Sequence, residues 1–425
     1  MKVFKFGGAS VKSADAVRNI VDILRKFEHT KIIIVVSAMG KMTNLLEKAV
    51  EAHRNGSPYD SVVAEFRHYH SEIIHELGGL SQDVQSRIDG FMEELDQLLS
   101  LPVASDYGMD YDRIVSIGEL VSTSIIEGFL KSSGFRSEWL DVRNVIVTDQ
   151  KHQNADVNWT RSSANADIMH HHLNEGDTDM LVTQGFIGRS ALGNTTTLGR
   201  EGSDFSAAIL AYLCDAEDVT IWKDVPGMLN ADPKWFNNTI KLEEVSYRET
   251  IELSYYGASV IHPKTIKPLQ NKNIPLYVKS FLHPEDPGTS IRDGATCVPE
   301  VPSYIFKADQ VLISISPKDF SFIVEQSLSE IFQAISDCGM KINLMQNSAL
   351  SFSIVVDNQP ARRQQLMELL SGSFSVRYNE GLKLLTIRHY DKKIADSLTQ
   401  GNEILVEQRS RHTWRIAMRE LSKSE

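Results

Sequence analysis

Short apolar runs alternate with amphipathic stretches through the first two-thirds of the chain. The segments Val3–Phe6 and Lys31–Val36 are rich in apolar residues, and Ala14–Phe27 between them repeats its apolar positions at helical spacing. Such runs are typical of strands buried on both faces of a parallel sheet, with a helix as the crossover. Further strand-like runs, separated by helical patterns, are Leu181–Thr183, Asp218–Trp222 and Ile274–Val278. The pattern predicts an α/β domain whose mainly parallel sheet is covered on both faces.

The region from about residue 59 to residue 99 departs from this alternation. Apolar residues recur at helical spacing from Phe66 to Leu77 and again from Ile88 to Leu99, and Gly78-Gly79 separates the two series. This pattern predicts a helical hairpin inserted in the sheet domain and packed on it, without evident chemistry of its own.

A second region follows a cluster of Pro, Gly, Asp and Ser between Pro284 and Pro302, which indicates a domain boundary. We expect a first domain over residues 1–292 and a second region over 303–425, divided into tandem α+β units of about 303–360 and 361–425. A turn is expected at Asn379–Gly381. The expected strands are Gln310–Ser316, Ile342–Met345, Ser351–Val356, Phe374–Tyr378, Leu382–His389, Glu403–Glu407 and Thr413–Met418, and the expected helices are Val324–Cys338 and one near Lys392–Leu398.

Length and charge narrow the function classes. The 425 residues are too many for one ordinary core, and the net charge of −12 argues against nucleic acid or an anionic membrane as a partner. Cys214, Cys297 and Cys338 show no paired spacing, so neither a disulfide framework nor a zinc site is indicated. No secretory signal is visible, and the apolar runs are too short to span a bilayer. We therefore expect a cytoplasmic protein.

The segment Lys5–Ser10 ends the first strand with a lysine and two glycines. The Lys5 ammonium could bind a phosphate while Gly7 and Gly8 let the backbone approach closely. The competing interpretation is an edge lysine before an ordinary tight turn. The segment by itself favours this second interpretation, because glycine pairs mostly mark turns and loops. Neither the P-loop pattern nor a helix-opening GxGxxG is present.

The segment Gly199–Asp204 is harder to explain as structure alone. It holds Arg200 between glycines and places Ser203 and Asp204 at the start of a helical pattern. Backbone N–H groups and the positive helix end would suit an anion there. An N-cap at Ser203, with Asp204 offsetting the helix dipole, explains the serine and the aspartate but not the arginine.

Three other segments each carry two interpretations. Thr43, in the loop Ser37–Thr43 after the second strand, either lines a ligand crevice or is a helix N-cap. Glu119 follows Ser116 in the S-x-x-E pattern of a capping box, which the local sequence favours, while the alternative is a carboxylate that receives a substrate ammonium. The turns from Trp222 to Lys234 either enclose a nucleotide base and ribose or are plain turns.

Taken in order, these segments resemble the amino acid kinase superfamily, and specifically the aspartate kinases. The resemblance covers about residues 2–292, and the tail resembles the paired ACT regulatory domains of the same enzymes. Any single motif is weak, but seven in register are highly specific. The matching segments are Lys5–Ser10, Val36–Met39, Ser116–Glu119, Leu198–Arg200 with Gly202–Asp204, Trp222 with Asp224–Gly227, Tyr256–Ala258 with Val260–Pro263, and Pro287–Thr289.

The resemblance implies a three-layer αβα kinase domain with tandem βαββαβ-like ACT domains, and a homodimer joined through them. It implies ATP-dependent phosphorylation of the L-aspartate side-chain carboxylate, the step that opens lysine, threonine and methionine biosynthesis. Mg²⁺ is expected near Asp204, held through phosphates and not by direct protein ligands. The implied roles are Lys5 and Asp204 in catalysis, Gly7, Gly8 and Ser10 at the phosphates, Ser37, Thr43, Glu119, Arg200 and Ser203 at aspartate, and Lys223, Asp224, Leu229, Lys234, Ser259 and Val260 at the nucleotide.

The chain departs from the pattern of the aspartate kinases at two notable points. Ala9 stands where threonine is usual, and Ser259 stands where many relatives carry a lysine that supports the ATP phosphates; Lys264 or Lys279 are candidates to compensate. Two rival functions stay open: an amino acid kinase acting on glutamate or acetylglutamate, and a non-catalytic amino-acid sensor. Lysine and threonine are both candidate effectors, and feedback control itself is open.

Overall fold

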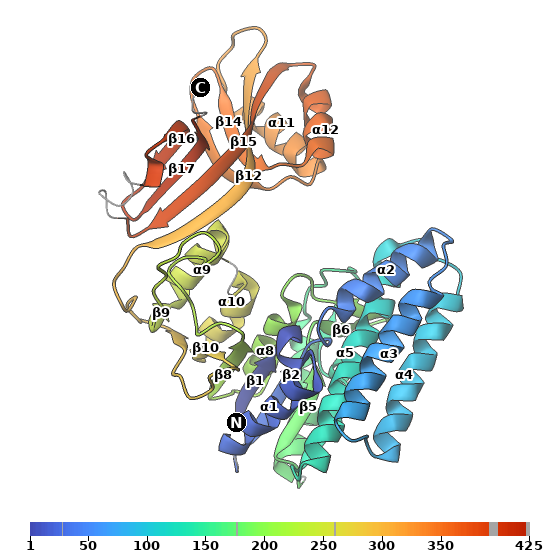
Figure 1. The fold of residues 1–425 in the computed structure, drawn as a ribbon. Coiled ribbons are helices and arrows are strands. Elements are labelled where there is room, and N and C mark those ends of the chain that lie inside the picture. The colour runs from blue at the N-terminus through green and yellow to red at the C-terminus, as the bar shows by residue number, and fades with distance from the viewer. Residues whose placement is uncertain (28, 176, 259–260, 391–397, 422–425) are drawn as a thin grey trace. The chain divides into compact units, whose positions relative to one another are not determined.

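The chain forms two compact units in the computed structural model, which describes residues 1–425 except 28, 176, 259–260, 391–397 and 422–425 (Figure 1). The first unit comprises Met1–Met228, Lys241–Ile251 and Val260–Pro299, and the second comprises Leu229–Ile240, Glu252–Ser259 and Glu300–Glu425. The domain limits expected from the sequence stay predictions.

The first unit is built on an eight-stranded sheet with the order β3-β5-β2-β1-β8-β10-β11-β9. Neighbouring strands are parallel from β3 to β10, β10 and β11 are antiparallel, and β11 and β9 are parallel. Each strand predicted for this region coincides with an observed one. The bounds are β1 Lys2–Phe6, β2 Ile32–Val36, β3 Ser137–Leu140, β5 Met180–Gln184, β8 Asp218–Lys223, β9 Glu244–Ser246, β10 Leu276–Ser280 and β11 Thr289–Arg292.

The register of the sheet brings three strand ends to one edge. Phe6 at the end of β1 pairs with Val36 of β2 on one side and with Trp222 of β8 on the other. The loops that follow these strands therefore meet at the carboxyl edge of the sheet, where open α/β sheets bind ligands.

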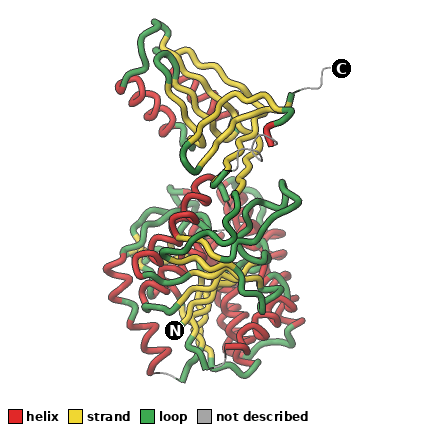
Figure 2. The backbone as a smooth tube through the Cα atoms, turned by 90° about the vertical axis from the view of Figure 1, so that its left-hand side faces the viewer, coloured by secondary structure: helices red, strands yellow, loops and turns green. Residues whose placement is uncertain are grey.

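Helices cover both faces of this sheet (Figure 2). The predicted hairpin is confirmed as α3 and α4, and a small sheet of the order β4-β6-β7 lies in the same unit. The bounds are α1 Ala14–Leu24, α2 Met42–Arg54, α3 Asp60–Glu76, α4 Gln82–Ser100, α5 Tyr107–Ser132, α6 Trp159–Ala164, α7 Asp167–His170, α8 Gly202–Leu213, α9 Tyr247–Tyr256, α10 Pro263–Lys272, β4 Val147–Thr148, β6 Ile187–Ser190 and β7 Thr195–Thr197, with short helices η1 Gly8–Val11, η2 Arg25–Phe27, η3 Val142–Asn144 and η4 His171–Glu175.

The long helix α5 was not predicted from the sequence. Its buried residues lie on all sides and include serines, threonines and glycines as well as aliphatic residues. A helix that is buried all round shows no amphipathic stripe, so its period is hidden.

The second unit contains an antiparallel six-stranded sheet with the order β13-β14-β12-β15-β17-β16. The helices α11 and α12 pack on one face around a core that includes Ile313, Ile331, Ile354 and Leu366. The bounds are β12 Ser303–Pro317, α11 Glu325–Asp337, β13 Ile342–Asn347, β14 Phe352–Asp357, α12 Pro360–Leu370, β15 Phe374–Arg388, β16 Asn402–Arg409 and β17 Thr413–Glu420.

One expected turn in this unit is wrong. The segment Asn379–Gly381 does not reverse the chain, because β15 runs through it and pairs with β12 on both sides of a register shift. Gly381 has a φ of +70° at this irregularity, a conformation that glycine adopts without strain. The helix α12 was missed, and the helix expected near Lys392–Leu398 lies mostly outside the described residues.

Among the described residues, no helix combines the length and apolar character that a membrane crossing needs.

Candidate active site

A cavity of about 670 Å³ lies at the carboxyl edge of the first unit's sheet. It brings together most of the residues predicted to bind phosphate and amino acid, from segments far apart in the chain. The lining residues are Lys5, Gly8, Ser37, Ala38, Gly40, Thr43, Glu47, Tyr111, Glu119, Gln153, Phe186, Gly199, Arg200, Glu201, Gly202, Ser203, Asp204 and Lys223.

Two lysine ammonium groups on the wall of this cavity form ion pairs with one aspartate carboxylate. Lys5 Nζ lies 2.6 Å from Asp204 Oδ1, and Lys223 Nζ lies 3.3 Å from Asp204 Oδ2. Burial would raise the pKa of Asp204, but the two lysines hold it below its usual value. The N-terminal strand and the segment Gly199–Asp204 therefore converge, as the sequence analysis required.

The loops that follow β1 and β2 contact each other through backbone atoms of Gly8 and Gly40. The Gly40 N–H donates to the Gly8 carbonyl at 3.0 Å. A Cβ atom at Gly8 would lie 2.8 Å from the Gly40 oxygen and 2.9 Å from the Ala38 oxygen, so only glycine fits. Gly7 and Ser10 are not among the lining residues; the buried Ser10 hydroxyl donates to the Trp222 carbonyl at 3.3 Å.

Another lining residue of the cavity, Glu119, lies in the middle of α5. The capping interpretation is wrong, because α5 begins at Tyr107, far upstream of Ser116. The Ala38 N–H donates to Glu119 Oε1 at 3.3 Å, and Oε2 has no hydrogen-bond partner in the described part of the chain. Burial raises the pKa of Glu119 to about 8. Among the described residues, this carboxylate has no cationic partner.

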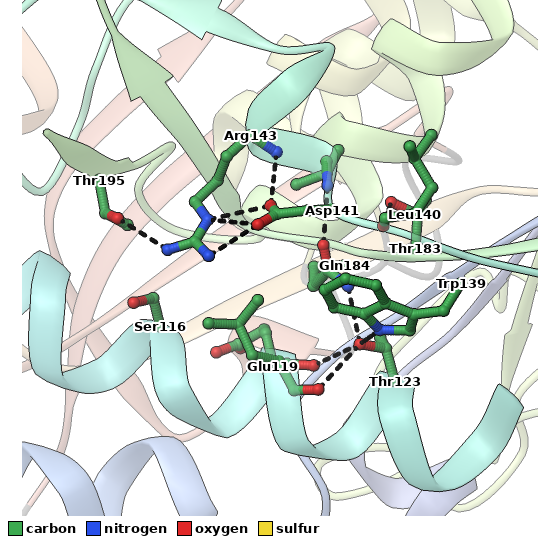
Figure 3. Close-up of polar contacts among 12 residues, drawn as sticks. Ser116, Glu119, Thr123, Trp139, Leu140, Asp141, Arg143, Thr183, Gln184 and Thr195 are labelled. Atoms are coloured by element: carbon green, nitrogen blue, oxygen red, sulfur yellow. Dashed lines mark hydrogen bonds and ion pairs between the residues drawn. The ribbon is translucent and has the colours of Figure 1, made fainter. Parts of the chain in front are cut away.

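A hydrogen-bond network links the turn of α5 that contains Glu119 to the sheet (Figure 3). The Thr123 hydroxyl donates to the Glu119 carbonyl at 2.9 Å. The same hydroxyl accepts from Trp139 Nε1 at 2.9 Å and from Gln184 Nε2 at 2.8 Å, so α5 is fixed to β3 and β5. The backbone that carries Glu119 is therefore rigidly placed against the sheet.

The remaining predicted acceptor residues border the cavity. Arg200 is exposed at the start of the loop that enters α8. Ser203 lies in the first turn of α8 and is not its N-cap, which is Glu201. Thr43 likewise lies inside α2, whose N-cap position is Lys41. The Gly202 and Asp204 N–H groups donate to the Gly199 and Glu201 carbonyls, so this wall attracts anions through the positive end of the α8 dipole.

Several predicted nucleotide residues do not border the cavity. Asp224 is exposed but is not a lining residue. Leu229 and Lys234 belong to the second unit, and Ser259 and Val260 lie outside the described residues.

The two candidate replacements for the missing lysine have other partners in the structure. Lys264 Nζ donates to Asn154 Oδ1. Lys279 Nζ lies 5.4 Å from the centroid of the Trp222 ring.

The sequence analysis missed Glu47, Tyr111, Gln153 and Phe186, which also line the cavity. The Tyr111 hydroxyl donates to Glu47 Oε1 at 2.8 Å. Glu47 follows Thr43 by one helical turn, a signal that could have placed both on the same face of α2. No such pattern marks the other three.

No cluster of three or more His, Cys, Asp or Glu side chains with metal-binding geometry occurs in the described ranges. The carboxylate of Asp204 is already ion-paired with Lys5 and Lys223. This donor set fits a magnesium ion that is held mainly by phosphate oxygens and not by the protein.

Comparisons with known proteins agree with this geometry. The sequence model of the amino acid kinase family matches residues 1–280. Lysine-sensitive aspartokinase 3 of Escherichia coli is 29% identical over 393 residues, which cover 91% of this chain and 86% of that protein. The chain spans only 39–42% of the plant bifunctional aspartokinase/homoserine dehydrogenases that it also matches.

Two crystal structures of E. coli aspartokinase III are similar over nearly the whole chain. The complex with aspartate and ADP, in the R-state, has a TM-score of 0.82 at 26% identity and covers 99% of this chain and 96% of that one. The complex with lysine and aspartate, in the T-state, has a TM-score of 0.80 at 27% identity and covers 98% and 95%.

Proposed function

Because the chain belongs to the amino acid kinase family, we propose that it is an aspartate kinase. It transfers the γ-phosphoryl group of ATP to the side-chain carboxylate of L-aspartate and produces 4-phospho-L-aspartate. The similarity to aspartokinases over the whole chain supports this substrate over glutamate or acetylglutamate.

One observation carries the proposal: a single cavity is lined both by the lysines Lys5 and Lys223 and by the unpaired carboxylate of Glu119. Lys5 and Lys223 suit the transferring phosphate, and Arg200 suits a substrate carboxylate. The buried Oε2 of Glu119 lacks a partner in the described structure, and the ammonium of an amino acid supplies one. Ser37, Thr43 and Ser203 complete the acceptor wall.

The residue types suit the reaction. The attacking carboxylate of aspartate is ionised at neutral pH, so no general base is needed. Catalysis then rests on alignment of the two substrates and on neutralisation of phosphate charge. Lys5 neutralises that charge, Asp204 holds the Lys5 and Lys223 ammoniums in place, and Gly8 lets the backbone approach the phosphates.

The nucleotide and its metal ion occupy the phosphate side in this proposal. Gly7 and Ser10 support the phosphate loop, and Mg²⁺ near Asp204 supplies further neutralisation of phosphate charge when bound. The assigned nucleotide residues are Lys223, Asp224, Leu229, Lys234, Ser259 and Val260. The ADP complex of the similar E. coli enzyme supports ATP as the donor.

The second unit has a regulatory role in this proposal. The similar E. coli protein is lysine-sensitive and has been crystallised with lysine, which supports lysine over threonine as the effector. We further propose that the chain forms a homodimer through its C-terminal region.

The test is hydroxamate formation from ATP, L-aspartate and hydroxylamine by the full chain, with Lys5→Ala as the control. We expect product from the wild type and a loss of at least about 100-fold in the variant. ADP release with glutamate and acetylglutamate identifies a different acceptor if one is preferred. No product above the Lys5→Ala background would support the sensor and overturn the proposal.

A further inference from the structure

Non-glycine residues in the left-handed backbone region gather at the cavity wall. Gln153, Phe186 and Glu201 have φ values of 62°, 70° and 55°, and all three line the cavity. Residues other than glycine adopt this conformation at a cost, and such strain concentrates at sites where the side chain is used. Gln153 is the member of this set whose N–H donates to a buried carboxylate.

A buried carboxylate holds Gln153 in this conformation. Asp112 of α5 is fully buried, and its Oδ1 and Oδ2 accept the Gln153 N–H at 3.1 and 3.2 Å. The same carboxylate accepts from His152 Nδ1 at 2.7 Å and from the Thr197 hydroxyl at 2.6 Å. Asp112 thus ties the loop of Gln153 to the end of β7.

The loop of Gln153 lies against the turn that presents Arg200. A Cβ atom at Gly199 would lie 3.3 Å from the Gln153 carbonyl oxygen and 2.7 Å from Asn154 Oδ1. The Ala155 N–H donates to the Thr197 carbonyl at 2.9 Å. Gln153 therefore lies beside Gly199, the residue before Arg200, although Gln153 is 47 positions before Arg200 in the chain.

We propose that Gln153 is an additional acceptor-binding residue, whose side-chain amide donates to the same substrate carboxylate as Arg200. Asp112 and His152 are its positioning residues. This inference rests on the proposed function and adds a residue to that site. A neutral amide adds a directional donor beside the guanidinium without further charge, so it fixes the orientation of the carboxylate.

The variant Gln153→Gly tests the proposal, since glycine removes the amide and relieves the backbone strain. We expect KM for aspartate to rise five- to tenfold, while kcat and KM for ATP change less than twofold and the melting temperature does not fall. Gln153→Asn, which tolerates the same backbone and keeps a shorter amide, should give an intermediate KM.

His29→Gly is the matched control. His29 has a φ of 68° and is exposed before β2, at the end of that strand opposite Ser37. We expect this variant to leave KM for aspartate unchanged, which separates strain relief from loss of the amide.

A double-mutant cycle tests the positioning role. Asp112→Asn should raise KM for aspartate by a similar factor, and Asp112→Asn with Gln153→Gly should be no worse than Gln153→Gly alone, because both act through one side chain. Additive effects would overturn the positioning role.

An unchanged KM for aspartate in Gln153→Gly, with an active wild type, overturns the inference and leaves the proposed function standing. A wild type that forms no aspartate-dependent product overturns the proposed function, and this inference with it.

Discussion

Two buried carboxylates that line one cavity have opposite electrostatic environments. Asp204 is paired with Lys5 and Lys223, which keep its pKa low. Glu119 has one backbone donor and a free oxygen, and burial raises its pKa to about 8. The first carboxylate is neutralised by the chain itself, whereas the second leaves room for a cation that arrives with the substrate. In the proposed function, Asp204 belongs to the catalytic group and Glu119 to the site that recognises the substrate ammonium.

The variant Lys5→Met tests the ion pair of Asp204 and should give the largest loss of activity. It removes the nearer cation from Asp204 and from the phosphate, so we expect kcat to fall at least about 100-fold. Breaking one partner of a buried pair costs up to about 3–5 kcal/mol, and the remaining Lys223 reduces that cost. Kinetics and urea unfolding measure the two effects.

Lys2→Met is the matched control, because Lys2 lies on the same strand and pairs with Asp218 near the surface. Its kinetics should match the wild type. Equal loss of kcat in the two variants would mean that Lys5 has no special role.

The variant Glu119→Gln tests the carboxylate without a cationic partner in the described structure. Losing a charged hydrogen bond of about 1.5–3 kcal/mol to the substrate ammonium should raise KM for aspartate about 10- to 100-fold. Stability should be unchanged or higher at neutral pH, because a buried carboxylate without a partner is removed. Steady-state kinetics and thermal unfolding measure both.

Glu127→Gln is the control for this variant. Glu127 is also fully buried on α5, but it pairs with Arg87 at 2.6 Å and Lys131 at 2.9 Å. It should lose stability and keep its KM for aspartate. If Glu119→Gln also lost stability and kept its KM for aspartate, the proposed difference between Glu119 and Asp204 would be contradicted.

The pH dependence of stability sharpens the comparison further. The pKa of Glu119 rises from 4.5 to about 8 on folding, so between these values the folded state holds a proton that the unfolded state has lost. Stability should therefore fall as pH rises through this window, by up to about 1.4 kcal/mol per pH unit. Urea unfolding of the free protein from pH 5 to 8 measures the slope, and Glu119→Gln should flatten it. Identical slopes in both proteins would contradict the unpaired state of Glu119.

The sequence predicts five of the eight strands of the first unit's sheet, because runs such as Ile32–Val36 are continuously apolar and a parallel sheet buries them on both faces. Lys5 and Asp204 were found because motifs mark both segments, and the register then brings them together. Glu119 was misread locally, since S-x-x-E also occurs inside a helix. The sequence analysis missed the true start of this helix, where the N-cap Asp106 accepts the Gly108 N–H at 2.9 Å.

Tertiary contacts decide the features that local patterns could not show. Asn379–Gly381 has the composition of a turn, yet pairing with β12 on both sides keeps β15 extended. Gln153 has no sequence signal, because its left-handed backbone depends on Asp112, 41 positions earlier in the chain.

The two 15-residue strands at the centre of the second unit, β12 and β15, have a mechanical consequence. Both run unbroken from the portion of the sheet beside β14 to the portion beside β17. The two portions therefore share continuous backbone through both strands. The hydrogen-bond ladder between β12 and β15 is irregular only at the register shifts between Lys307 and Leu312, where a bulge locally bends and twists a sheet.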